Sequence, residues 1–125
     1  MKQIFIGLDG KEYSLRFYHF AITGPLPTGA EMRQLRDIFE EAFRLRQVKC
    51  YGGRQRSIPY IRACTICTVD WQDSVGEWIN IRKGFSFCSS RDQYNKKRGR
   101  QIAFGRVLRE LSQAEQEKIL SQVSV

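Results

Sequence analysis

The sequence predicts an α+β domain in which an antiparallel sheet is covered on one face by helices. Two pairs of β-type segments are present, and one amphipathic helical segment separates the pairs. Two more helical segments follow the second pair, so the predicted order is ββαββαα. Grouped strands favour an antiparallel sheet, because parallel sheets need a helical crossover after each strand.

The first two strands are predicted to form a hairpin. Residues 2–6 are a short apolar run, and residues 12–21 alternate between apolar and polar side chains. Asp9 and Gly10 lie between them, and an Asp-Gly pair is a strong hairpin-turn signal. The segment that follows contains two prolines and is therefore a predicted loop.

A helix is predicted from Thr28 to about Gln47. Thr28 and Glu31 form a capping box, in which each residue satisfies a backbone N–H at the helix start. Apolar side chains then recur at helical spacing and make one face, namely Met32, Leu35, Ile38, Phe39, Ala42 and Phe43. Packing against a core explains this face completely.

The second pair of strands is predicted over residues 58–69 and 76–88. A connection rich in glycine and arginine, residues 49–57, precedes them, and turn-forming residues at 70–74 separate them. We expect a bulge at Gly84, because glycine inside a strand often marks one.

Two helices complete the predicted fold. The first is expected from about residue 90 to about residue 111. Ser112 and Glu115 form a second capping box, so a short helix should follow, through about residue 122.

Length and composition limit the class of protein. The 125 residues make one domain, 1–125, and exclude a large multidomain enzyme. Hydrophobic residues are 42% of the chain, too many for a disordered protein. No apolar run is long enough to cross a bilayer, and the first residues lack the features of a signal peptide. We therefore expect a cytoplasmic protein with no membrane partner.

Four cysteines, Cys50, Cys64, Cys67 and Cys88, require an explanation. Without a secretory context we expect free thiols rather than disulfides. Cys64 and Cys67 have the spacing of a zinc knuckle, but they lie in a β-branched run. On a strand, residues three apart face opposite sides. We therefore favour small buried side chains over a metal site and expect no cofactor.

The net charge of +8 is concentrated in two stretches. Nine basic residues lie between Arg82 and Arg109, opposed there only by Asp92. The second stretch runs from Arg44 to Arg62 and has no acidic residue. On a helical wheel, several of the cations continue the apolar face, where they cannot be buried unpaired. Either the start of this helix extends beyond the core or the regular helix begins near Gly99.

These cations suit phosphate. An arginine guanidinium binds phosphate oxygens in pairs, and a helix N-terminus adds free N–H groups. Gly99 and Gly105 each precede an arginine, and a glycine allows a phosphate or a backbone to come close. The candidate contacts are Arg91, Lys96, Lys97, Arg98, Arg100 and Arg106, with Arg54 and Arg56 as a second patch. Phe85, Phe87, Tyr94 and Trp78 are candidates for base stacking, although core packing is the simpler explanation of Phe85 and Phe87.

Residues 85–106 resemble a segment of small proteins from phages, prophages and plasmids. The shared positions are Cys88, Ser89, Asp92, Tyr94, Lys97, Gly99, Arg100, Ala103, Gly105 and Arg106. The resemblance implies a mobile-element accessory protein, a group that includes anti-CRISPR inhibitors of bacterial defence.

Enzyme motifs are sparse. His19 is the only histidine, and a structural role suits it better than catalysis. Cys88, where a strand ends near a helix start, is a candidate nucleophile, yet the arginine that a phosphatase loop requires six positions on is replaced by Tyr94. Phosphate-loop, dinucleotide and zinc-protease motifs are absent from the sequence.

We therefore expect a non-enzymatic protein that contacts nucleic acid, DNA or RNA, or a host nucleoprotein complex. Two alternatives remain open at this point. One is an anti-CRISPR-like inhibitor that uses the same cations against an acidic channel of a host enzyme. The other is a small enzyme that depends on Cys88.

Overall fold

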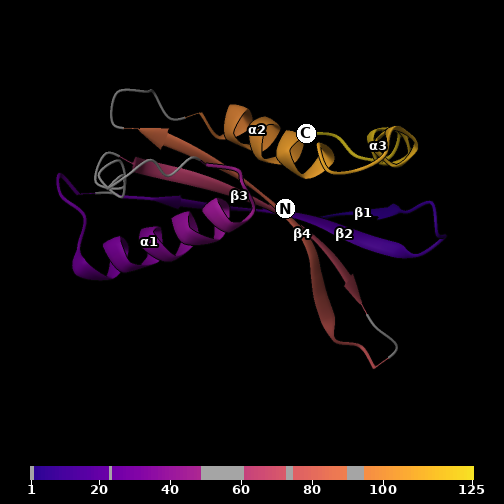
Figure 1. Ribbon diagram of the computed structural model, residues 1–125, viewed down its shortest axis with the longest axis horizontal. Coiled ribbons are helices and arrows are strands. Elements are labelled where there is room, and N and C mark those ends of the chain that lie inside the picture. Colours follow the sequence, from indigo (N-terminus) through magenta and orange to yellow (C-terminus); the bar gives the residue numbers. More distant parts are fainter. Residues whose placement is uncertain (1, 23, 49–60, 73–74, 90–94) are drawn as a thin grey trace.

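The computed structural model describes residues 2–22, 24–48, 61–72, 75–89 and 95–125, and Figure 1 shows their arrangement. Four antiparallel strands form one sheet in the order β1-β2-β3-β4. The strands are β1 (Lys2–Ile6), β2 (Glu12–Ala21), β3 (Ile61–Gln72) and β4 (Trp78–Ser89). The helices are α1 (Gly29–Arg44), α2 (Lys96–Leu108) and α3 (Gln113–Leu120). The predicted α+β class and the order ββαββαα are confirmed.

The helices cover both faces of the sheet, whereas the sequence pattern predicted coverage of one face. Figure 1 shows α1 on one side of the strands and α2 with α3 on the other. Two contacts of β4 agree with this arrangement. The rings of Phe87 and Phe39 in α1 lie 5.7 Å apart, whereas Gly84 faces the backbone of Ala103 in α2. Positions 84 and 87 differ by an odd number, so they point to opposite faces.

Each face has its own apolar core. Under α1 the buried side chains are Ile22, Leu35, Phe39 and Ile61. Under α2 and α3 they are Phe5, Leu15, Cys67, Val69, Ala103, Phe104, Val107, Leu108 and Ile119. The central strand β3 contributes to both faces, and six of its residues from Ala63 to Val69 are buried. A nearly continuous run of small and apolar residues is typical of a strand with both faces covered.

Gly84 has a different role from the predicted bulge. It pairs with Cys67 in regular register, and the register shifts occur between Ile61 and Ala63 and between Val69 and Asp70. A Cβ atom at position 84 would lie 1.9 Å from the carbonyl oxygen of Ala103. Glycine is therefore required here because α2 lies directly on the strand.

The ends of the elements follow local chemistry. Both predicted capping boxes are present, at Thr28 and at Ser112, and Gly10 takes a positive φ of 77° in the first hairpin. Helix α1 ends at Arg44 rather than near residue 47, since Arg46 takes a positive φ of 59°. Helix α3 ends at Leu120, two residues before the predicted end. The predicted strand residues 58–60 lie outside the described residues.

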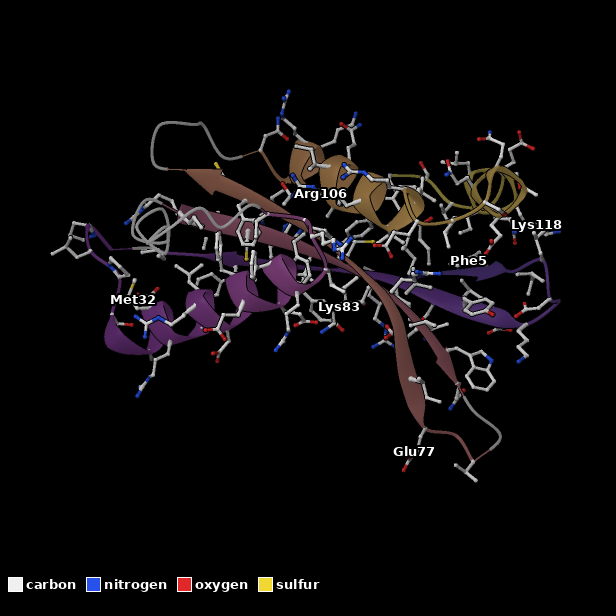
Figure 2. All side chains as sticks on the ribbon, in the orientation of Figure 1. Phe5, Met32, Glu77, Lys83, Arg106 and Lys118 are labelled. Carbon is white, nitrogen blue, oxygen red and sulfur yellow. The ribbon has the colours of Figure 1, made fainter. Side chains whose placement is uncertain are left out.

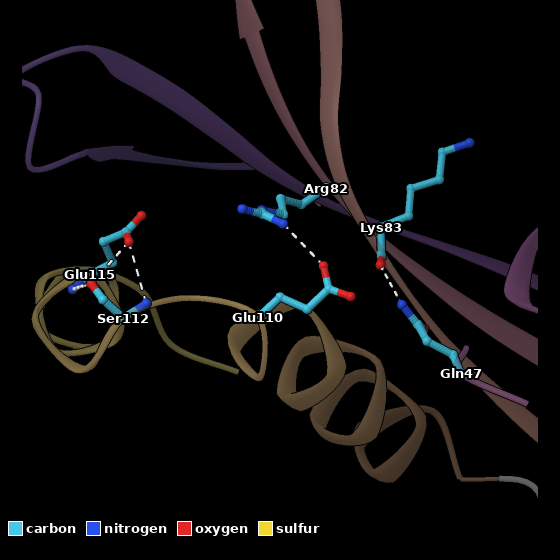
Figure 3. Close-up of polar contacts among 6 residues, drawn as sticks. All are labelled: Gln47, Arg82, Lys83, Glu110, Ser112 and Glu115. Carbon is cyan, nitrogen blue, oxygen red and sulfur yellow. Dashed lines mark hydrogen bonds and ion pairs between the residues drawn. The ribbon is translucent and has the colours of Figure 1, made fainter. Parts of the chain in front are cut away.

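The side chain of Gln47 covers part of the outer edge of β4. Its amide nitrogen donates to the carbonyl of Lys83 at 2.8 Å (Figure 3), and its amide oxygen accepts from the N–H of Phe85 at 2.7 Å. These backbone groups would otherwise be exposed on an edge strand, where they could pair with another chain. The residues after α1 therefore protect the sheet edge.

Candidate nucleic-acid interface

The first turn of α2 carries the most exposed cluster of candidate residues. The helix begins at Lys96, with Asn95 as its cap, and the Asn95 side chain accepts a hydrogen bond from the N–H of Arg98 at 3.1 Å. The predicted start near residue 90 falls among residues 90–94, outside the described part of the chain. We call Lys96, Lys97, Arg98 and Arg100 the basic surface. The first three are exposed and Arg100 is half-buried.

The charge of the basic surface is not neutralised by its own helix. Residues 95–109 contain no aspartate or glutamate. The ion pairs found among the described residues involve other cations. A cluster of exposed, like-signed charges raises the local concentration of anions and speeds their association.

Three other basic residues of the same stretch serve the fold instead. Arg82 pairs with Glu110 at 3.0 Å (Figure 3), and Lys83 pairs with Glu41 at 2.7 Å. Arg106 lies on the sheet side of α2 (Figure 2) and donates to the carbonyl of Phe85. The tertiary structure thus separates the anchored cations of the stretch from the basic surface.

Arg106 was a candidate contact, and its environment is partly buried. Burial lowers the pKa of its guanidinium, and the neighbouring charge of Arg109 adds to the effect. Since one donor already binds Phe85, Arg106 holds α2 against β4.

The second predicted patch and one end of the first fall outside the described residues. These are Arg54, Arg56 and Arg91. Arg62, from the same basic stretch as Arg54, donates to the backbone carbonyls of Ile22, Gly24 and Pro25, so it anchors the loop before α1.

Gly99 is buried within the fold, in contrast to its predicted role of admitting a phosphate. A Cβ atom there would lie 2.5 Å from the hydroxyl oxygen of Thr65 in β3. Thr65 is only 1% exposed, so the first turn of α2 presses against the sheet at this point. Gly105 differs, because it is exposed and a Cβ atom added there would have no other atom within 4 Å.

His19 lies beside the basic surface, although its sequence context predicted a structural role. Its Nδ1 lies 3.0 Å from the Thr65 hydroxyl, and the residue is exposed. Burial of part of the ring lowers the pKa of His19, and the nearby charges of Lys96 and Arg100 lower it further. No sequence signal indicates this proximity, since His19 and Lys96 are 77 positions apart and meet only through the strand pairing and the Gly99 contact.

Two of the four candidate stacking side chains lie in the described part of the structure, and both pack within the fold. Phe85 is 1% exposed, and its ring stacks on Phe87 with centroids 6.3 Å apart. Phe87 also contacts Phe39 beneath α1. Both rings are therefore core residues, as the simpler explanation predicted. Tyr94 and the side chain of Trp78 lie outside the described part of the structure.

The described cysteines have different environments. Cys64 and Cys67 are free and fully buried, and burial raises the pKa of both thiols to about 12. They pair with Phe87 and Gly84, which face opposite sides of the sheet, so the two sulfurs cannot bind one ion together. Cys88 is partly exposed. Within the described residues, no group of three or more potential metal ligands is found.

A pocket of about 270 Å³ lies at the opposite end of α2, between the β1–β2 hairpin and α3. Its walls are mainly apolar and include Phe5, Val69 and Ile119. The carboxylates of Asp9 and Glu115 also line it. Arg82 lines it too, so the border carries charges of both signs and contains none of the residues of the basic surface.

Comparison with known proteins yields no relative. No protein-family model matches the chain, and neither a curated protein nor a solved structure does. None of the helices in the described ranges has the length and apolar character needed to span a membrane.

Proposed function

We propose that this protein binds nucleic-acid phosphates through the basic surface, without catalysing a reaction on them. The observation that carries the proposal is the exposure of Lys96, Lys97 and Arg98 on one helical turn, while Arg82, Lys83 and Arg106 are anchored within the fold. Cations that stabilise a fold are usually paired, whereas cations that bind phosphate must remain accessible.

The packing of the candidate stacking rings supports backbone contact over base stacking. Phe85 is buried and Phe87 is partly buried against the core under α1, so neither ring is presented for stacking on bases beside the basic surface. Phosphate contacts alone bind without strong sequence preference, and their affinity falls steeply with salt. In a mobile-element setting, such a protein would act as an accessory factor on DNA or RNA.

The test is a salt titration of binding to a fluorescent single-stranded oligonucleotide. Lys97→Gln and Arg98→Gln should each weaken binding at low salt. Each should also reduce the slope of log affinity against log salt by about 0.7, the value for one phosphate contact on a single strand. Arg33→Gln and Arg36→Gln are the matched controls, since both residues are exposed on α1 on the other face of the sheet.

The controls should leave both the affinity and the slope unchanged. Equal losses of affinity in the α1 and α2 variants would show that binding depends only on the net charge of the protein. That result would contradict the assignment of binding to the basic surface. If free DNA and RNA do not bind at low salt, the proposal is wrong. Recovery of one protein partner after nuclease treatment would then favour the inhibitor of a host enzyme.

A further inference from the structure

We propose that His19, Lys96 and Arg100 form a phosphate subsite in which binding of the anion is coupled to uptake of a proton by the His19 imidazole. This inference rests on the proposed function and specifies which part of the basic surface holds a phosphate. It also predicts a pH dependence that exposed lysines and arginines alone would not produce.

The His19 ring and the first turn of α2, which carries Lys96 and Arg100, meet at Thr65. The Thr65 hydroxyl lies 3.0 Å from Nδ1 of His19, and the same hydroxyl lies directly against Gly99. Gly99 is flanked by Arg98 and Arg100, and it lies within one turn of Lys96. Lys96 and Arg100 are four residues apart and so share one side of α2. Substituting a larger residue at 99 would lift this turn away from His19.

The electrostatics of the free site are unfavourable for a charged histidine. Partial burial opposes protonation of His19, and the charges of Lys96 and Arg100 oppose it as well. The amino-terminal charge adds a smaller effect of the same sign. The facing groups of β3 do not compensate, since Thr65 is neutral and burial keeps Cys67 protonated with a pKa of about 12. Helix α1 packs on the opposite face of the sheet.

A bound phosphodiester would reverse this balance. Its negative charge would lie between the two cations and the ring. The attraction between the anion and the protonated imidazole would then exceed the repulsion between the imidazole and the two cations. A protonated imidazole has a donor on each nitrogen, so it can contact Thr65 and still add charge to the site. Solvent supplies the proton, which binds the ring nitrogen, and no other bond changes.

Linkage sets the expected size of the effect. A rise of about one unit in the pKa of His19 on binding corresponds to about tenfold tighter binding below that pKa than above it. The sign is that affinity increases as the pH falls from about 8 to about 5, the range over which histidine titrates. Phosphodiesters and sulfate keep their charge across this range, so the ligand does not contribute to the change.

The deciding experiment follows the imidazole resonances of the intact chain by NMR. Because His19 is the only histidine, its signals need no assignment variants. The pKa is measured in the free protein, with saturating sulfate, and with a short oligothymidine. We expect a value below the ordinary 6.5 in the free protein and an increase with both ligands. An unchanged pKa with oligothymidine bound would overturn the proposal.

Two variants identify the groups involved. His19→Gln keeps a side chain that can contact Thr65, and it should remove most of the pH dependence of oligothymidine affinity. Lys96→Gln should raise the pKa of His19 in the free protein and reduce the further increase on binding. Lys118→Gln, on exposed α3, is the matched control and should change neither quantity. Full pH dependence in His19→Gln would contradict the assignment and point to the amino terminus.

The experiment separates this inference from the proposed function. Oligothymidine binding with no movement of the His19 pKa leaves the proposed function intact and removes the subsite. A His19 pKa that rises with sulfate but not with oligothymidine would show an anion site that does not bind the nucleic-acid backbone, and it would overturn the proposal. If oligothymidine neither binds nor changes the His19 pKa, both the subsite and the proposed function are wrong.

Discussion

Gly84 allows α2 to lie directly on β4, so Gly84→Ala is the substitution that tests the fold most directly. The new Cβ would lie 1.9 Å from the carbonyl oxygen of Ala103 and 2.9 Å from a methyl group of Val107. A side chain could rotate away, but the oxygen belongs to the helix backbone. The helix must therefore retreat by at least 1.1 Å to reach even 3.0 Å, a distance still tighter than ordinary contact.

Retreat of the helix loosens the core beneath it. Ala103 and Val107 are 0% and 1% exposed, and both depend on close contact with the sheet. Overpacking a core typically costs about 1–3 kcal/mol. Since an entire helix must move, we expect a loss of about 3 kcal/mol in the free energy of unfolding. For a domain of this size, the loss corresponds to a fall of roughly 10 °C in melting temperature.

The assay is urea unfolding followed by circular dichroism, with calorimetry for the melting temperature. Gly105→Ala is the matched control, because it makes the same change in α2 where no atom lies within 4 Å of the new Cβ. Alanine in place of an exposed helical glycine should raise stability by up to about 1 kcal/mol. Wild-type stability in Gly84→Ala would refute the reasoning, as would an equal loss in both variants.

Three further predictions concern separate parts of the molecule. Ser112→Ala removes the cap of α3 and should lower the free energy of unfolding by about 1 kcal/mol in urea titration; an unchanged midpoint would show that the cap is not needed. Iodoacetamide at about pH 8 should spare Cys64 and Cys67 in the native protein and modify them in urea, as read by peptide mass spectrometry, because burial raises the pKa of both thiols to about 12. The lowered pKa of His19 means that the unfolded chain binds more protons, so its contribution to stability is present above pH 6.5 and is lost as the pH falls; the urea midpoint of wild type should therefore drop relative to that of His19→Gln as the pH is lowered from about 7 to about 5, and a constant difference between the two would contradict the lowered pKa.

Local patterns in the sequence were sufficient for most of the elements. The strand at residues 12–21 was predicted with its observed bounds, since period-two alternation needs no tertiary information. The capping boxes at Thr28 and Ser112 were equally local, because both partners lie within three residues of each other. The observed end of α1 differs from the predicted one because it depends on the left-handed conformation of Arg46. An arginine carries no local signal for that conformation, whereas a glycine would.

The interface shows where such patterns stop being informative. Charge clustering identified Lys96, Lys97, Arg98 and Arg100, which the structure leaves accessible to different degrees. It could not separate them from Arg106, because the carbonyl that Arg106 binds belongs to a strand 21 residues away. Nor could it include a histidine from β2.

The sequence alone determines which segments form helices and strands and where positive charge is concentrated, because both depend on residues close together in the chain. The distribution of helices over two faces does not, since an amphipathic helix has the same pattern whichever face of a sheet it covers. The roles of the glycines also depend on what lies opposite them: Gly84 faces a helix backbone and Gly99 faces Thr65. These contacts join distant segments, and they alone bring His19 beside the start of α2.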